Sequence, residues 1–123
     1  MAEQWREIIG ADGATIRFSV AESGDAFVTL LCVHGWTLDH RSFVHQRALS
    51  HSGVRVVSFD RRGFGRNQSV PGLDLELEDL DALVNAFPAP VVGFGVSQGA
   101  RLLLRYAVTV SYTHLTLPTN REV

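Results

Sequence analysis

Residues 91–100 read VVGFGVSQGA, and this stretch decides the fold of the chain. Its first four residues form a short apolar run typical of a buried strand, and the residues after Gly99 favour a helix. Between them, Gly95-Val96-Ser97-Gln98-Gly99 has the G-x-S-x-G spacing of a sharp strand-to-helix turn that exposes a serine hydroxyl. Glycine at both ends of the motif leaves room for the neighbouring strand and helix. Ser97 is therefore our candidate catalytic nucleophile.

The composition indicates one ordinary globular domain at most. The chain has 123 residues, 46% of them hydrophobic and 20% charged, and a net charge of −2, which does not indicate nucleic acid or an anionic membrane as a partner. Cys32 is the single cysteine and lies in an apolar run, so we expect a buried thiol and no disulfide within the chain. The N-terminus lacks the order of a signal peptide, and no apolar stretch approaches the roughly 20 residues that span a membrane. We expect a cytoplasmic protein.

Strand patterns precede the serine motif. Residues 8–9 and 15–20 predict two strands joined by a tight turn at Asp12-Gly13, and the second alternates as a half-buried edge strand does. Residues 27–33 are nearly all apolar, as expected of a strand covered on both faces. Residues 54–59 predict a further strand that ends at Asp60, before a glycine-rich loop.

Helix patterns alternate with these strands. Residues 39–49 predict a helix with Asp39 as N-cap and Gly53 as its stop. Residues 73–87 place an apolar residue on one helical face at every third or fourth position. The acidic residues between them are expected on a solvated face and not in a metal site. These acidic residues are Glu76, Glu78, Asp79 and Asp81. Residues 101–107 predict the last helix.

The order is therefore a hairpin followed by strands that alternate with helices. Strands joined by helical crossovers run parallel, which predicts a three-layer α/β/α sandwich with a mostly parallel sheet and an antiparallel N-terminal hairpin. The chemistry of such sheets gathers at the carboxyl ends of the strands. His34-Gly35-Trp36, Asp60 and Ser97 each follow a predicted strand, so we expect them to meet at one site.

A serine that attacks an acyl carbonyl needs hydrogen-bond donors for the oxyanion that forms. In this turn the N–H of the residue after the nucleophile, Gln98, is one donor. The loop after the strand at residues 27–33 supplies the other. Gly35 allows close approach of the backbone there, so the N–H of Trp36 is the candidate second donor.

Three motifs together resemble the α/β-hydrolase fold family, especially its esterases, cofactor-independent haloperoxidases and C–C hydrolases. They are His34-Gly35-Trp36, residues 60–66 (DRRGFGR) and Gly95-Val96-Ser97-Gln98-Gly99, in the order that the family uses. The resemblance covers roughly residues 5 to 108 and implies the N-terminal half of that fold.

The resemblance also implies the roles of the site residues. Ser97 would be the nucleophile, and Trp36 and Gln98 would supply the backbone oxyanion hole. A supporting role would fall to His34, Gly35, Asp60, Gly95 and Gly99. The implied activity is that of a serine hydrolase acting on a small-molecule carboxylic ester, lactone or thioester, without cofactor or metal. Acyl transfer and perhydrolysis share the same first half and stay open, as does the oligomeric state.

The chain departs from the family after the serine motif. The catalytic acid and histidine follow the serine on later strands in this family. Only 24 residues follow Gly99 here, and the predicted helix uses about ten of them, so neither partner fits. His40, His45 and His51 lie in the wrong place for the base and are assigned to the surface. We therefore predict that the chain as given is inactive.

Residues 109–123 change character and match nothing that the family places after this helix. Their threonine-rich start and Pro118 disfavour a helix, and we interpret them as foreign, adapter-like read-through. The predicted organisation is a partial hydrolase domain over residues 1–108 and a non-native tail over 109–123. The strand that leads to Ser97 would then be a sheet edge without its neighbour.

Two other functions remain open. A non-catalytic binding protein could keep this fold without the chemistry. The spacing of Gly93, Gly95 and Gly99 is also compatible with a dinucleotide-binding fragment that holds phosphate at the helix N-terminus, although no acidic ribose partner fits in the remaining length.

Overall fold

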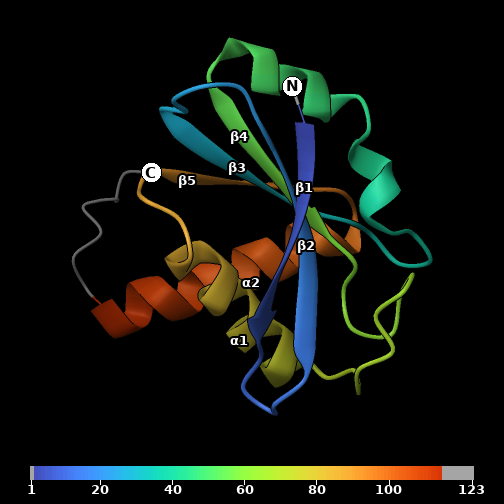
Figure 1. The fold of residues 1–123 in the computed structure, drawn as a ribbon. Helices are drawn as coiled ribbons and strands as arrows, with labels where there is room; N and C mark the ends of the chain where they lie inside the picture. Colours follow the sequence, from blue (N-terminus) through green and yellow to red (C-terminus); the bar gives the residue numbers. More distant parts are fainter. Residues whose placement is uncertain (1, 115–123) are drawn as a thin grey trace.

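A computed structural model describes residues 2–114 of the chain (Figure 1). The described residues form five strands, two short 3₁₀ helices and two α-helices. The hydrophobic patterns predict each of these strands and α-helices, but β1 begins six residues before the predicted strand at residues 8–9. In chain order the elements are β1 (Ala2–Ile9), β2 (Thr15–Glu22), β3 (Val28–Val33), η1 (His40–Phe43), η2 (Gln46–Ser52), β4 (Val54–Phe59), α1 (Leu73–Asn85), β5 (Val91–Gly95) and α2 (Gln98–His114).

The strands form one mixed sheet in the order β1-β2-β4-β3-β5. β3 pairs in parallel with β4 and with β5, because the chain returns across the sheet between these strands. β1 and β2 are antiparallel to each other, and β2 is antiparallel to β4. The hairpin turn is as predicted, but β1 and not β2 forms the sheet edge. β2 is paired on both sides, which explains why four successive residues of it are buried.

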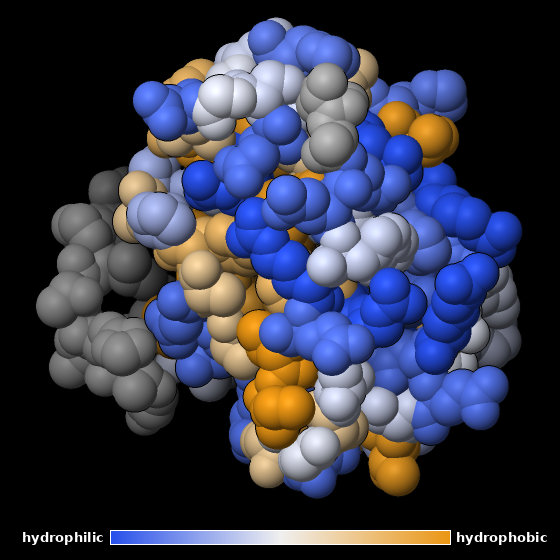
Figure 2. Space-filling model, in the orientation of Figure 1, coloured by the Kyte–Doolittle hydropathy of each residue, from blue (hydrophilic) through white to orange (hydrophobic). Residues whose placement is uncertain are grey.

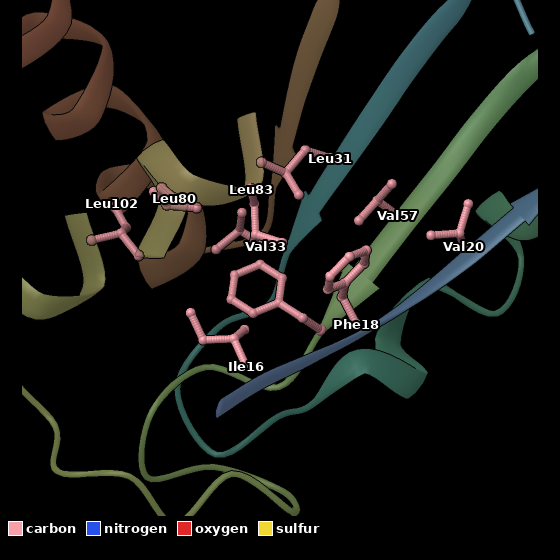
Figure 3. Close-up of a cluster of buried hydrophobic side chains, with 10 residues drawn as sticks. Ile16, Phe18, Val20, Leu31, Val33, Val57, Leu80, Leu83 and Leu102 are labelled. Atoms are coloured by element: carbon pink, nitrogen blue, oxygen red, sulfur yellow. The ribbon is translucent and has the colours of Figure 1, made fainter. Parts of the chain in front are cut away.

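Helical layers cover both faces of this sheet, which confirms the predicted α/β sandwich. On one face α1 and α2 pack against the main hydrophobic core, where side chains from strands and helices point toward one another (Figure 3). On the other face η1 supplies Phe43, which packs into a smaller cluster with Cys32 and Val56. Cys32 is fully buried, as predicted. The main core consists of Ile16, Phe18, Val20, Leu31, Val33, Val57, Phe59, Leu80, Leu83 and Leu102.

The helix predicted at residues 39–49 is instead the pair of 3₁₀ helices η1 and η2. Asp39 caps η1 as expected, with its carboxylate accepting from the N–H of Arg41, and Gly53 ends η2 in a left-handed conformation. Between these ends, η1 turns so that Phe43 is buried while His40 bonds Asp60. These tertiary contacts override the helical propensity of the segment.

The acidic face predicted for α1 is only partly solvated. Asp79 is buried and pairs with Arg62, and Glu76 pairs with the buried Arg61. The prediction was wrong for both residues because helical periodicity does not reveal cations that arrive from another loop.

Helix α2 spans Gln98–His114 and so continues past residue 107, the last residue of the predicted helix. The expectation that the threonine-rich start of the tail disfavours a helix was therefore wrong for residues 109–114. The rest of the tail predicted at 109–123 lies outside the described residues. Within residues 2–114, no helix is both long and apolar enough to cross a membrane.

Candidate active site

The carboxyl ends of three adjacent strands form the candidate site. β3 lies between β4 and β5, so the segment after β3 is flanked by Asp60 on one side and by Ser97 on the other. The N–H of Val96 bonds the carbonyl of Val33 at 3.1 Å, which ties the serine turn to the end of β3. The three predicted motifs therefore lie at one edge of the molecule, as expected for a parallel arrangement.

Ser97 occupies the sharp turn between β5 and α2. Its backbone has φ 55°, a left-handed conformation that non-glycine residues rarely adopt, and its side chain is exposed. The turn needs glycine at position 99, because a Cβ there would lie 2.1 Å from the carbonyl oxygen of Val33. A Cβ at position 95 would lie 2.5 Å from the amide nitrogen of Ala100. Strand, turn and helix thus approach too closely for any side chain at either glycine.

The two candidate oxyanion donors lie beside this serine. Gln98 is the first residue of α2, so its N–H has no acceptor within the helix. A Cβ on Gly35 would come within 3.3 Å of the Ser97 Cβ, which shows how closely the backbone next to Trp36 approaches the serine. Within the described residues, the backbone N–H groups of Trp36 and Gln98 have no hydrogen-bond partner. The Trp36 side chain is 68% exposed.

His34 is fully buried next to the site, and both of its ring nitrogens are engaged. Nε2 accepts the backbone N–H of Arg61 at 2.9 Å, so the ring proton is on Nδ1, which donates to the carbonyl of Gly35 at 2.7 Å. Burial lowers the pKa of this imidazole, in keeping with a neutral ring. His34 therefore holds the loop after β3 in place and has no nitrogen available to activate Ser97.

Arg61 connects the three strand ends. Its guanidinium is nearly buried and forms a bidentate ion pair with Glu76 on α1. Nη1 of the same group donates to the carbonyl of His34 and to Oε1 of Gln98, at 3.2 and 2.8 Å. The side chain of the residue after the serine is thereby fixed. The sequence predicts only a glycine-rich loop after Asp60 and does not reveal these partners of Arg61.

Asp60 organises the loop that follows β4. Its carboxylate accepts the backbone N–H of Arg66 and of His40, and also the ring Nδ1 of His40 at 2.7 Å. Burial by itself would raise the pKa of Asp60, but these hydrogen bonds outweigh it and hold the pKa below its usual value. His40 was predicted at the surface; it is partly buried instead, because Asp60 holds its ring.

Asp39, His40 and Asp60 bring potential metal ligands within 4.8 Å of one another. The Asp39 carboxylate already pairs with Arg41 at 2.6 Å, and both oxygens of Asp60 already accept N–H groups. Because these lone pairs are engaged, we assign no metal to the cluster.

The site lacks a base for Ser97 within the described residues. Among residues 3–110, whose side chains the structure describes, no histidine or carboxylate bonds the Ser97 hydroxyl. One sequence signal could have revealed the supporting ion pairs: Arg61 and Arg62 follow a buried strand and need anionic partners, and the nearest acidic run is residues 74–81.

Comparison with known proteins identifies the family. Residues 30–119 match the family model described as the alpha/beta hydrolase family, which is well over half of the chain. The chain belongs to that family.

Solved structures share its fold. A mutant epoxide hydrolase from Vigna radiata superposes with a TM-score of 0.75 at 23% identity, over 87% of this chain and 35% of its own. The alpha/beta hydrolase GrgF from Penicillium sp. sh18 has a TM-score of 0.76 at 18% identity, over 87% and 42%. The thioesterase domain from the curacin biosynthetic pathway has a TM-score of 0.77 at 23% identity, over 89% and 42%. The chain thus spans well under half the length of these proteins.

Proposed function

We propose that Ser97 is the nucleophile of a serine hydrolase that acts on a small-molecule ester, lactone or thioester. The observation that carries the proposal is the conformation of Ser97: a left-handed serine, exposed between two glycines that tolerate no side chain. Backbone strain of this kind persists only where the surrounding structure enforces it, and it concentrates at functional sites.

The surroundings of Ser97 suit acyl chemistry. The carbonyl carbon attacked by the hydroxyl gives up its π bond to oxygen, and the resulting oxyanion needs nearby N–H donors. The free N–H groups of Trp36 and Gln98 are the proposed donors. The N-terminus of α2 adds partial positive charge at the same place. Losing one such donor typically costs about 2.7–4 kcal/mol of transition-state stabilisation.

The solved structures that share this fold leave two substrate classes open, an epoxide and an acyl compound. One neighbour is an epoxide hydrolase and another is a thioesterase domain. We favour the acyl substrate because the turn carries a serine, whose hydroxyl forms an acyl-enzyme when a base removes its proton. A non-catalytic binding protein is the alternative and predicts an unreactive Ser97.

We further propose that the chain is the N-terminal part of a longer enzyme whose remainder supplies the acid and the histidine. An unassisted serine is a poor nucleophile at its free pKa. The 123-residue chain should therefore show no Ser97-dependent hydrolysis of p-nitrophenyl acetate. A rate that falls on Ser97→Ala, measured beside Ser69→Ala as a matched control, would refute this second proposal.

Fluorophosphonate labelling of the full-length protein tests the nucleophile itself. Attack by the Ser97 oxygen on phosphorus expels fluoride and leaves a covalent phosphonyl-serine. We expect one labelled serine, identified as Ser97 by peptide mass spectrometry, with labelling lost in Ser97→Ala and retained in Ser69→Ala. Absence of label on a folded full-length protein would favour the non-catalytic alternative.

A further inference from the structure

The guanidinium of Arg61 makes more contacts than its neutralisation requires. Hydrophilic side chains cover much of the molecular face shown in Figure 2, where water solvates them. The Arg61 side chain is instead only 4% exposed. A buried charge is costly unless it is paired, and the ion pair with Glu76 already supplies the counter-charge. The other hydrogen bonds of this guanidinium therefore need an explanation of their own.

Three contacts hold the guanidinium in one orientation. Nε and Nη2 donate to the two carboxylate oxygens of Glu76, at 2.6 and 3.1 Å. The central carbon of the group lies 5.1 Å from the centre of the Phe64 ring, which covers it. A bidentate pair fixes the plane of a guanidinium in a way that a single charge contact does not. The remaining nitrogen, Nη1, consequently has a defined position.

Nη1 joins two segments that lie on either side of Ser97. It donates to the backbone carbonyl of His34 at 3.2 Å and to Oε1 of Gln98 at 2.8 Å. The backbone N–H of Arg61 makes a third link, to Nε2 of His34 at 2.9 Å. One of these segments leads to Trp36, and the other is the start of α2. Arg61 thus contacts both segments that carry the proposed oxyanion donors.

The bond to Gln98 fixes the side chain of that residue. A guanidinium has donors and no acceptor, so the carboxamide of Gln98 must present its oxygen to Arg61. Gln98 is the first residue of α2, where the backbone N–H is not held by a hydrogen bond within the helix. The anchor at the far end of the side chain therefore limits how far this N–H can turn.

We propose that Arg61 is a positioning residue that sets the two oxyanion donors, the N–H groups of Trp36 and Gln98, in register with each other. The inference rests on the proposed function of Ser97. Arg61 acts through the His34 carbonyl and the Gln98 carboxamide, and it does not itself contact the substrate. Two donors stabilise one oxyanion only if both point at the same place. Displacing a catalytic group by about 1 Å can cost about 100-fold in rate.

The adjacent arginine shows that pairing with α1 does not by itself lead to these contacts. Arg62 is also buried and pairs with α1, through Asp79, which lies three residues after Glu76 on the same helical face. Its other bonds go to Asp12 and to the carbonyl of Val70, away from the segments beside Ser97. Both arginines fasten α1 to the sheet, but of these two only Arg61 also reaches the site.

The rate at which a fluorophosphonate labels Ser97 in the full-length protein tests this role. The phosphonyl oxygen gains negative charge as the serine oxygen attacks phosphorus and fluoride leaves, so the rate depends on the oxyanion donors. Gln98→Met removes the acceptor of the Arg61 bond and keeps both the backbone N–H at position 98 and the pair between Arg61 and Glu76. Gln68→Met, at an exposed glutamine in the loop after β4, is the matched control.

We expect Gln98→Met to lower the maximal labelling rate at least about tenfold. The fluorophosphonate concentration that gives half the maximal rate should stay the same, because the donors act on charge that develops only in the transition state. Gln68→Met should label at the full rate. A purely structural role of the Arg61 bond would lower the melting temperature of Gln98→Met without slowing the labelling of the folded protein.

A double-mutant cycle shows whether the two residues act through one contact. Arg61→Met should slow labelling at least as much as Gln98→Met, because it releases both segments. Adding Gln98→Met to Arg61→Met should cause no further loss, since the bond is already absent. Gln98→Met leaves every buried charge paired, so it decides the question by itself if Arg61→Met does not fold.

The possible failures are distinguishable. Equal labelling rates for Gln98→Met and the unsubstituted protein would overturn the positioning role and leave Ser97 as the nucleophile. Losses that multiply in the double variant would also overturn it, because the two residues would then act independently. A folded, unsubstituted full-length protein without label on Ser97 would refute the proposed function, and this inference with it.

Discussion

The proposed role of Ser97 depends on Gly99, a neighbouring residue that has no side chain. Gly99 packs its α-carbon so closely on the end of β3 that a Cβ would lie 2.1 Å from the carbonyl oxygen of Val33 and 2.5 Å from that of His34. These are backbone atoms at the end of β3 and in the residue after it, and they cannot rotate away as a flexible side chain can. The exposed position of Ser97 thus rests on contact between two backbones.

Gly99→Ala should therefore destabilise the chain strongly. We expect a loss of about 3 kcal/mol in the free energy of unfolding, because a single methyl group would force strand and helix apart. Urea denaturation followed by circular dichroism measures this. Gly72→Ala is the matched control, since a Cβ there lies 3.7 Å from its nearest neighbour. Equal stability of the two variants would show that α2 moves away from β3 without cost.

At the scale of elements, the loop after β4 fastens α1 and the N-terminal hairpin to the sheet. The side chain of Arg62 is completely buried. Its guanidinium bonds both carboxylate oxygens of Asp79 on α1 and both of Asp12 in the turn between β1 and β2. One side chain therefore joins segments that are 50 residues apart in the chain.

Arg62→Ala should cost about 3–5 kcal/mol of folding free energy, because the buried carboxylate of Asp79 would lose its counter-charge. Arg41→Ala is the matched control. Arg41 also pairs with an aspartate, Asp39, but its side chain is 79% exposed, and exposed pairs contribute about 0–1 kcal/mol. Chemical denaturation of both variants measures the difference. A loss below about 1 kcal/mol for Arg62→Ala would mean that the Asp79 carboxyl takes up a proton or reaches water.

For the whole molecule, stability depends on pH through carboxylates that pair with arginine. The hydrogen bond from Arg62 is the largest influence on Asp12 and lowers its pKa from 3.8 to about 2. The hydrogen bond from Arg41 likewise lowers the pKa of Asp39 to about 2. A carboxyl whose pKa is lower in the folded than in the unfolded state stabilises the fold above its unfolded pKa. That contribution is lost as the pH falls through the folded pKa.

Asp12→Asn should therefore be less stable than the unsubstituted chain above about pH 4, and the difference should shrink as the pH falls toward about 2. Urea unfolding of both chains between pH 6 and pH 2 measures the difference in free energy. Asp25→Asn, in the exposed turn before β3, is the matched control. A difference between the Asp12 variant and the unsubstituted chain that is independent of pH would contradict the link to Asp12 ionisation.

Hydrophobic patterns were sufficient for much of this fold. The apolar runs at residues 28–33 and 54–59 are buried parallel strands, and the 3.6-residue period of residues 73–85 is α1. Pattern failed at residues 39–52, where Phe43 enters the core and Asp60 holds His40, so that two 3₁₀ helices replace one α-helix. The helical pattern also placed Asp79 in solvent, because only the folded chain brings the guanidinium of Arg62 into contact with its carboxylate.

The sequence by itself determined the parts of this protein that depend on local order: strand, turn and helix around Ser97, with glycine at positions 95 and 99. It also determined the family, because three motifs recur in the right order along the chain. The tertiary structure decided which charges are buried, how Arg61 and His34 support the loop beside Ser97, and in which order the strands pair in the sheet. The physical reason is that burial and ion pairing join residues far apart in sequence, and no local pattern records such distances.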